Sequence, residues 1–167
     1  EIVRNEAATE GEKKCVKELG AWNLEARAGF IAPAVFREFW NELNRLTWDD
    51  ETTENMGRMP WPSSQVMVDL VLNEPGASWF DDKATPDHES MPQIAGRAFR
   101  SAVANLEKKW GPWGDAWRWG KVKGTELRHL ARIPGFGRKI EADGAGQVID
   151  AISSVWAPTA RSASVSL

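Results

Sequence analysis

Two histidines are the side chains of this sequence best suited to acid–base chemistry, and a structural role explains each. His88 lies between Asp87 and Glu89 near a predicted helix start, where capping and solvation account for all three residues. His129 falls in a predicted strand, where a structural hydrogen bond accounts for it. Cys15 is the only cysteine, so no zinc site of cysteine and histidine ligands can form. The sequence predicts no catalytic, cofactor-binding or metal-binding residue in the chain.

Carboxylates and glycines supply the remaining candidate sites. Four acidic residues have the oxygen ligands that calcium prefers, but their spacing is not that of an EF-hand loop: Asp81, Asp82, Asp87 and Glu89. The pairs Gly135/Gly137 and Gly144/Gly146 lack the strand–helix context of a phosphate-binding loop. We expect solvated acids in the first case and turns in the second.

Tryptophan is unusually common, with 10 residues against no tyrosine. Such a set could form a stacking platform for sugars or single-stranded nucleic acid. However, Trp40 falls in a predicted helical core stripe, and basic residues are dispersed among acidic ones, with a net charge of −3. The pattern therefore favours core packing and no nucleic-acid partner. A tryptophan-rich surface covered by a protein partner stays open as the alternative.

The composition is that of one folded domain. The chain has 167 residues, of which 42% are hydrophobic and 27% charged. No apolar run is long enough to cross a membrane, and no signal-peptide pattern is present. Because the chain begins with Glu1 rather than methionine, we expect a processed or excised piece.

The first two thirds of the chain have helical periodicity. Weak apolar spacing predicts an amphipathic helix within residues 1–20, and a stronger stripe follows Pro33: Val35, Phe36, Phe39, Trp40, Leu43 and Leu46. Ser63 or Ser64 should cap a short helix with an apolar side of Val66, Met67, Leu70 and Val71. A long helix should begin at Thr85 or at Ser90 and end at Gly111–Pro112, with a stripe of Ile94, Ala95, Ala98, Phe99, Ala102, Val103 and Leu106.

Beyond Pro112 the pattern changes to one typical of strands. Trp110–Gly120 holds four tryptophans separated by glycines and is predicted as a joint leading into sheet. Further strands are predicted around 126–130 and 139–141, residues 147–155 carry spaced apolar side chains, and 162–167 alternates with period two up to the last residue. We expect an α+β fold with a helical covering segment, 1–111, and a strand-rich segment, 112–167. The final strand also suggests that the natural polypeptide continues.

Several collinear motifs resemble the penicillin acylase family of N-terminal-nucleophile hydrolases, which includes acyl-homoserine-lactone acylases. Trp117-Arg-Trp119-Gly120 followed by His129 is similar to a W-x-W-G…H segment of that family. Earlier matches, in the same order, are Trp22-Asn23 with Phe36-Arg-Glu-Phe-Trp40, then Ser78-Trp-Phe-Asp-Asp82 with Thr85, and, after the joint, Gly144 to Ile152. Lys121-Val-Lys123 departs from the family, which often has a histidine there.

The resemblance implies a place in the later part of the large β subunit, within a four-layer αββα fold. The catalytic serine of such enzymes is the first residue of that subunit, and its α-amino group, of pKa about 8, acts as the base. This sequence begins with Glu1 and has no W-N-N-x-P segment for the oxyanion-stabilising asparagine. We therefore expect a structural portion of a serine-type acylase that is inactive when isolated.

The same resemblance sets the expected surroundings of the chain. Its partners would be the remainder of the β subunit and the α subunit of one precursor, with an acyl amide as the parent's substrate and no membrane or nucleic acid. Calcium would bind the intact parent through other segments, and the location would be periplasmic or secreted. The alternative is a non-catalytic, tryptophan-rich binding or interaction domain.

Overall fold

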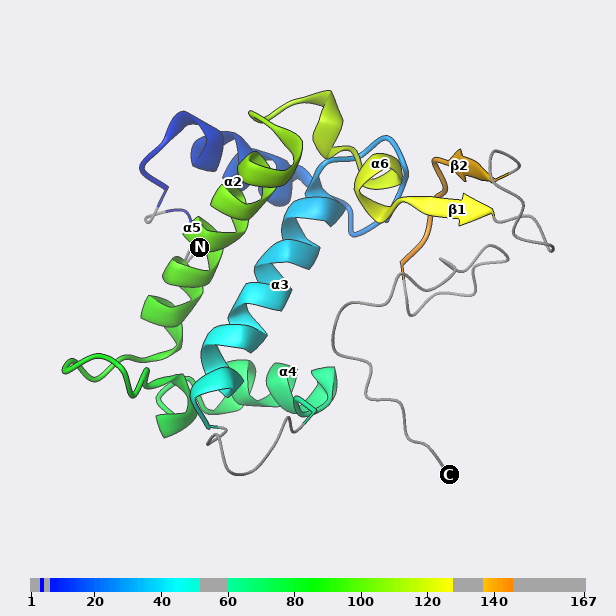
Figure 1. Cartoon of the computed structure of the whole chain (residues 1–167). Coiled ribbons are helices and arrows are strands. Elements are labelled where there is room, and N and C mark those ends of the chain that lie inside the picture. The colour runs from blue at the N-terminus through cyan, green and yellow to red at the C-terminus, as the bar shows by residue number, and fades with distance from the viewer. Residues whose placement is uncertain (1–3, 5–6, 52–59, 128–136, 146–167) are drawn as a thin grey trace, which may run out of the picture. The chain divides into compact units, whose positions relative to one another are not determined.

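The structure is a computed structural model that describes residues 4, 7–51, 60–127 and 137–145 (Figure 1). The chain divides into two compact units. The helical unit comprises Glu1–Trp22 and Val35–Trp113, and the second unit comprises Asn23–Ala34 and Gly114–Leu167. No helix among the described residues is long and apolar enough to cross a membrane.

The described part of residues 7–110 contains four α-helices and two short 3-10 helices. They are α2 (Glu10–Ala21), α3 (Ala32–Trp48), η1 (Asp49–Glu51), α4 (Ser64–Asn73), η3 (Ser78–Phe80) and α5 (Met91–Trp110). A capping box starts α2, in which the hydroxyl of Thr9 accepts the backbone N–H of Glu12 and the Glu12 carboxylate accepts that of Thr9. The predicted helices are therefore confirmed, and α4 follows Ser63 at its predicted cap position.

Helix α5 forms the centre of the helical unit. All seven apolar residues of its predicted stripe are buried, and its small alanines allow close packing. Asn105 donates a hydrogen bond to Glu42 of α3 at 3.1 Å, which fixes the two helices side by side (Figure 1). Of the two predicted starts, Ser90 is correct and Thr85 is wrong, because the Gln93 side chain accepts the Ser90 backbone N–H at 3.0 Å. Gly111 closes the helix at a φ of 82°.

Three helical side chains lie on other faces than predicted. Phe36 is 41% exposed and Val66 is 48% exposed, although both were expected in apolar stripes. Glu42 lies outside the predicted apolar stripe, which places it on the outer face of its helix, but it is only 9% exposed. Its carboxylate pairs with Arg45 at 2.9 Å and accepts from Asn105, and these bonds compensate for its burial.

The joint after Pro112 is helical, so its predicted sheet is wrong. The structure has a 3-10 turn, η4 (Asp115–Trp117), and then α6 (Trp119–Lys123). Arg118 pairs with Asp115 at 2.8 Å, three residues away, and Val122 donates to the carbonyl of Arg118 at 3.0 Å. The change of pattern after Pro112 predicted a strand, but these local bonds stabilise turns.

One short antiparallel ladder follows in the second unit. β1 (Thr125–Leu127) pairs with β2 (Arg138–Ile140), with Glu126 opposite Lys139 (Figure 1). The described residues are thus mostly helical, and the four-layer sheet architecture stays a prediction. So does the division at residue 111 into a covering and a strand-rich segment. His129, Gly135, Gly146, residues 147–155 and the strand predicted at 162–167 lie outside the described residues.

Candidate functional site

An apolar pocket of about 410 Å³ lies in the helical unit between the end of α3, α4 and η3. Its lining residues are Trp48, Glu51, Pro60, Trp61, Pro62, Val66, Leu70 and Trp79. Trp48 is buried and Trp79 is 45% exposed, and their rings meet at a centroid distance of 5.6 Å. Both the volume and the aromatic lining are within the range of small-molecule sites.

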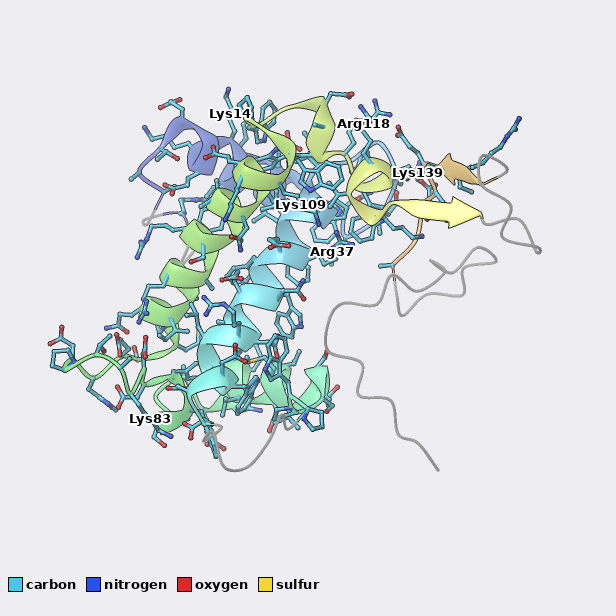
Figure 2. All side chains as sticks on the ribbon, viewed as in Figure 1. Lys14, Arg37, Lys83, Lys109, Arg118 and Lys139 are labelled. Carbon is cyan, nitrogen blue, oxygen red and sulfur yellow. The ribbon has the colours of Figure 1, made fainter. Side chains whose placement is uncertain are left out.

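Polar contacts hold the edge of this pocket in place. The indole Nε1 of Trp61 donates to Asp49 at 2.9 Å. Lys83, on the loop after η3, pairs with Glu51 and donates its backbone N–H to Asp50 at 3.1 Å (Figure 2). Burial raises the pKa of the Asp50 carboxyl above its ordinary value. These bonds connect the end of α3 to the loops on either side of α4.

The pocket has the chemistry of a binding surface rather than of a reaction centre. Among its described lining residues the one ionisable group is Glu51, whose carboxylate already pairs with Lys83. No histidine, serine or cysteine belongs to that lining. What these side chains can do is enclose an apolar or aromatic group and exclude water from it.

The acidic loop before α5 is a network of charges around Arg97. The guanidinium contacts Asp82 at 2.6 Å and Glu89 at 3.0 Å. The hydroxyl of Thr85 donates to Glu89 at 2.9 Å. The pKa of Asp82 lies below its ordinary value, mainly because of the hydrogen bond from Arg97. Thr85, predicted as a helix cap, instead stabilises this loop through its hydrogen bond to Glu89.

The predicted acid–base candidate His88 lies in the same loop. Its Nδ1 contacts Asp81 at 3.0 Å, and its side chain is 71% exposed. The His88 contact and the backbone N–H of Glu89 lower the pKa of the Asp81 carboxyl. The structure therefore gives the carboxylates of Asp81, Asp82 and Glu89 protein partners, which does not fit a calcium site. Among the described residues, no group of three or more potential ligands is placed to hold a metal ion.

The Trp117–Gly120 motif connects three segments of the second unit. Trp117 is fully buried and Trp119 is 4% exposed. The indole Nε1 of Trp119 donates to the carbonyl of Gly144 at 2.7 Å, and its backbone N–H donates to Phe30 at 2.8 Å. Gly120 donates to Ala28 at 2.9 Å. Trp117 and Trp119 therefore have a structural role in the interior of the second unit, as the sequence predicted.

Sequence reasoning did not find the pocket, although one signal was present. The sequence Pro60-Trp61-Pro62 by itself indicates a stiff, extended connector, because a residue that precedes proline avoids the helical region. Two prolines around a half-buried loop tryptophan also form a rigid apolar wall. Trp48 and Trp79, from distant parts of the sequence, complete that wall, and no local pattern predicts their meeting.

These features define a mostly helical segment that has an aromatic pocket and a turn held in place by Trp119. The candidate acid–base groups among its described residues take part in structural hydrogen bonds and ion pairs. The penicillin amidase family model matches residues 2–166, and the chain belongs to this family. Acyl-homoserine lactone acylase QuiP of Pseudomonas aeruginosa is 26% identical over an alignment of 125 residues, and the match covers 70% of this chain but only 15% of that acylase. No solved structure matches the chain.

Proposed function

We propose that this chain is a structural portion of a serine-type acylase that cleaves acyl amides. The observation that carries the proposal is the family match, which runs along 165 residues from 2 to 166. The weaker likeness to an acyl-homoserine lactone acylase agrees with it. Family resemblance supports acyl-homoserine lactones and β-lactam side chains as candidate substrates of the parent.

The reaction proposed for the parent is acyl transfer through its own N-terminal serine. The serine oxygen adds to the amide carbonyl, the C–N bond breaks with protonation of the leaving amine, and water then releases the acid from the acyl-enzyme. Residues 1–167 supply no nucleophile in this proposal. Their role is structural, because they form the covering helices and the turn at Trp119.

The remaining features of the proposal concern the surroundings of the chain. Its partners are the rest of the β subunit and the α subunit of one precursor, and its location is periplasmic or secreted. Only the family likeness supports these points. Calcium in the parent is assigned to other segments, because Asp81, Asp82 and Glu89 are occupied by protein partners.

Parallel hydrolysis assays of the parent and of residues 1–167 test this function. Both proteins are incubated with a panel of acyl-homoserine lactones and phenylacetyl amides, and free amine is measured. The expected result is turnover by the parent and none by residues 1–167. Turnover by the short chain would contradict a structural role, and a parent inactive on every acyl amide would refute the acylase assignment.

The aromatic pocket favours a second candidate function, a non-catalytic binding domain. Three indoles and two prolines around about 410 Å³ suit an apolar or aromatic ligand. Titration of the parent with decanoate and with indole, followed by tryptophan fluorescence, tests it against a Trp79→Ala variant. Saturable binding that the variant loses, in a parent without acylase activity, would favour this alternative over the first.

A further inference from the structure

Helix α4 is apolar around most of its circumference. Six of its ten residues are aliphatic or methionine: Val66, Met67, Val68, Leu70, Val71 and Leu72. A surface helix normally carries one apolar stripe, whereas a helix that is apolar on several sides is typical of a protein interior. The sequence of α4 therefore indicates that structure covers it on more than one side.

Only one of these sides is covered by the helical unit. Met67 and Leu70 are buried at 0% and 8% exposure. Val68 and Leu72, four residues apart, lie one above the other on a different face of the helix. Leu72 is 72% exposed and Val68 is 38% exposed, so the described residues leave Leu72 largely uncovered and Val68 partly uncovered. We call Val68 and Leu72 the outer stripe.

The polar side of α4 is narrow and has no positive charge. Asp69 is its one charged residue, and it accepts a hydrogen bond from Asn73 at 2.6 Å. Helices that lie on membrane surfaces usually carry lysine or arginine on their polar face, and α4 has neither. This charge pattern argues for a protein surface rather than a lipid surface as the cover.

The size of the outer stripe distinguishes between two possible covers, a second copy of the chain and a segment of the same polypeptide. A stable interface between separate molecules buries about 800 Å² on each partner. Two aliphatic side chains provide much less, so a second copy would gain little from them. A segment of the same polypeptide is already held nearby and has almost no association entropy to lose. The match spans only 15% of the related acylase, so a parent of similar length has many further residues that can supply the cover.

We propose that the outer stripe of α4 is an intramolecular docking surface, covered by an apolar segment of the same polypeptide from outside residues 1–167. This inference rests on the proposed function, because it needs the larger parent of an acylase. It assigns α4 to the interior of that parent, between the other helices of the helical unit and the apolar segment that docks on α4. The aromatic pocket, lined by Val66 and Leu70, lies along a different face of the same helix.

Thiol labelling of the full-length parent tests whether the stripe is covered. Leu72→Cys is compared with Ala104→Cys, which introduces a thiol at an exposed position of α5. The native parent is treated with a maleimide, and labelling is quantified by peptide mapping, so that buried Cys15 is scored separately. We expect the thiol at position 72 to react at least about tenfold more slowly than that at position 104, and equally fast in urea. Equal native rates would overturn the proposal.

A photo-crosslinking residue at position 72 of the parent identifies what covers the stripe. The expected adduct joins α4 to a peptide of the same polypeptide outside 1–167, with a yield that does not change on dilution. An adduct only to residues 1–167 of a second copy, or to lipid, would overturn the inference. Acylase activity of the same preparation separates the two claims. An active parent with a freely labelled position 72 refutes the docking surface alone, whereas a protected stripe in a parent inactive on all acyl amides refutes the proposed function.

Discussion

Replacing Gly120 with alanine should loosen the turn that ties the second unit together. A Cβ added at Gly120 would lie 2.6 Å from the Cβ of Glu141 and 2.9 Å from that of Ala28. It would also lie 3.0 Å from the Cα of Glu141, so rotating a side chain cannot relieve the clash. Ordinary contacts begin at 3.4 Å, and the segment carrying Glu141 must therefore retreat by about 0.8 Å.

The cost of Gly120→Ala follows from that displacement. Overpacking of a well-packed site costs about 1–3 kcal/mol. The retreat also strains the hydrogen bond from Gly120 to Ala28, now 2.9 Å long, which contributes about 1 kcal/mol. We expect a total loss of about 2–4 kcal/mol. Since 1 kcal/mol lowers the Tm of a domain of 150–250 residues by about 2–4 °C, we expect a drop of at least about 4 °C where the domain that holds Gly120 melts as a step of its own.

Thermal unfolding and limited proteolysis of the full-length parent measure this effect, with Gly29→Ala as the matched control. Gly29 lies in the same unit, and no atom lies within 4 Å of its added Cβ. We expect the control to melt within about 1 °C of the wild type and Gly120→Ala to be cut faster in the second unit. If both variants melt alike, the close approach of the Glu141 segment to Gly120 is wrong.

Two further predictions concern ionisable groups of the helical unit. Arg97 keeps the pKa of Asp82 low, so its ion pairs stabilise the fold above the ordinary carboxyl pKa of about 4 and lose that contribution as the pH falls through the lowered value. Arg97→Leu should therefore destabilise the parent by about 1–3 kcal/mol at pH 7 and by progressively less as the pH falls below about 4, and a Tm loss that does not shrink over this range would contradict the pairing. Burial, with nearby Glu107, raises the pKa of the Cys15 thiol to about 12; iodoacetamide at pH 8 should leave the native thiol unmodified and alkylate it in urea, and fast native alkylation would show that Cys15 is accessible.

The sequence predicted the helices well because their signals are local. The stripe from Ile94 to Leu106 repeats at helical spacing over several turns, and Gly111 ends it, so α5 needed no tertiary information. The helix begins after Ser90 rather than after Thr85 because the Gln93 side chain accepts the Ser90 backbone N–H, and the Ser90–Gln93 spacing of this capping box is itself a local signal.

Contacts between distant segments explain what the sequence could not predict. Trp119 was expected in sheet, but its place depends on the carbonyls of Phe30 and Gly144, which lie far away along the chain. The pocket likewise needs Trp48 and Trp79 to meet. No periodic pattern encodes such pairs. The family motifs did identify Trp119 as important, although they gave no geometry for it.

The central claim is that the parent's nucleophile lies outside these 167 residues, and covalent labelling of the active parent tests it most directly. The parent is inactivated with phenylmethylsulfonyl fluoride, digested and mapped by mass spectrometry, with an acyl amide present in a protection control. We expect one substrate-protected sulfonyl group on a serine at the N-terminus of the processed β chain, outside residues 1–167. Substrate-protected labelling of a serine within 1–167 would contradict the account.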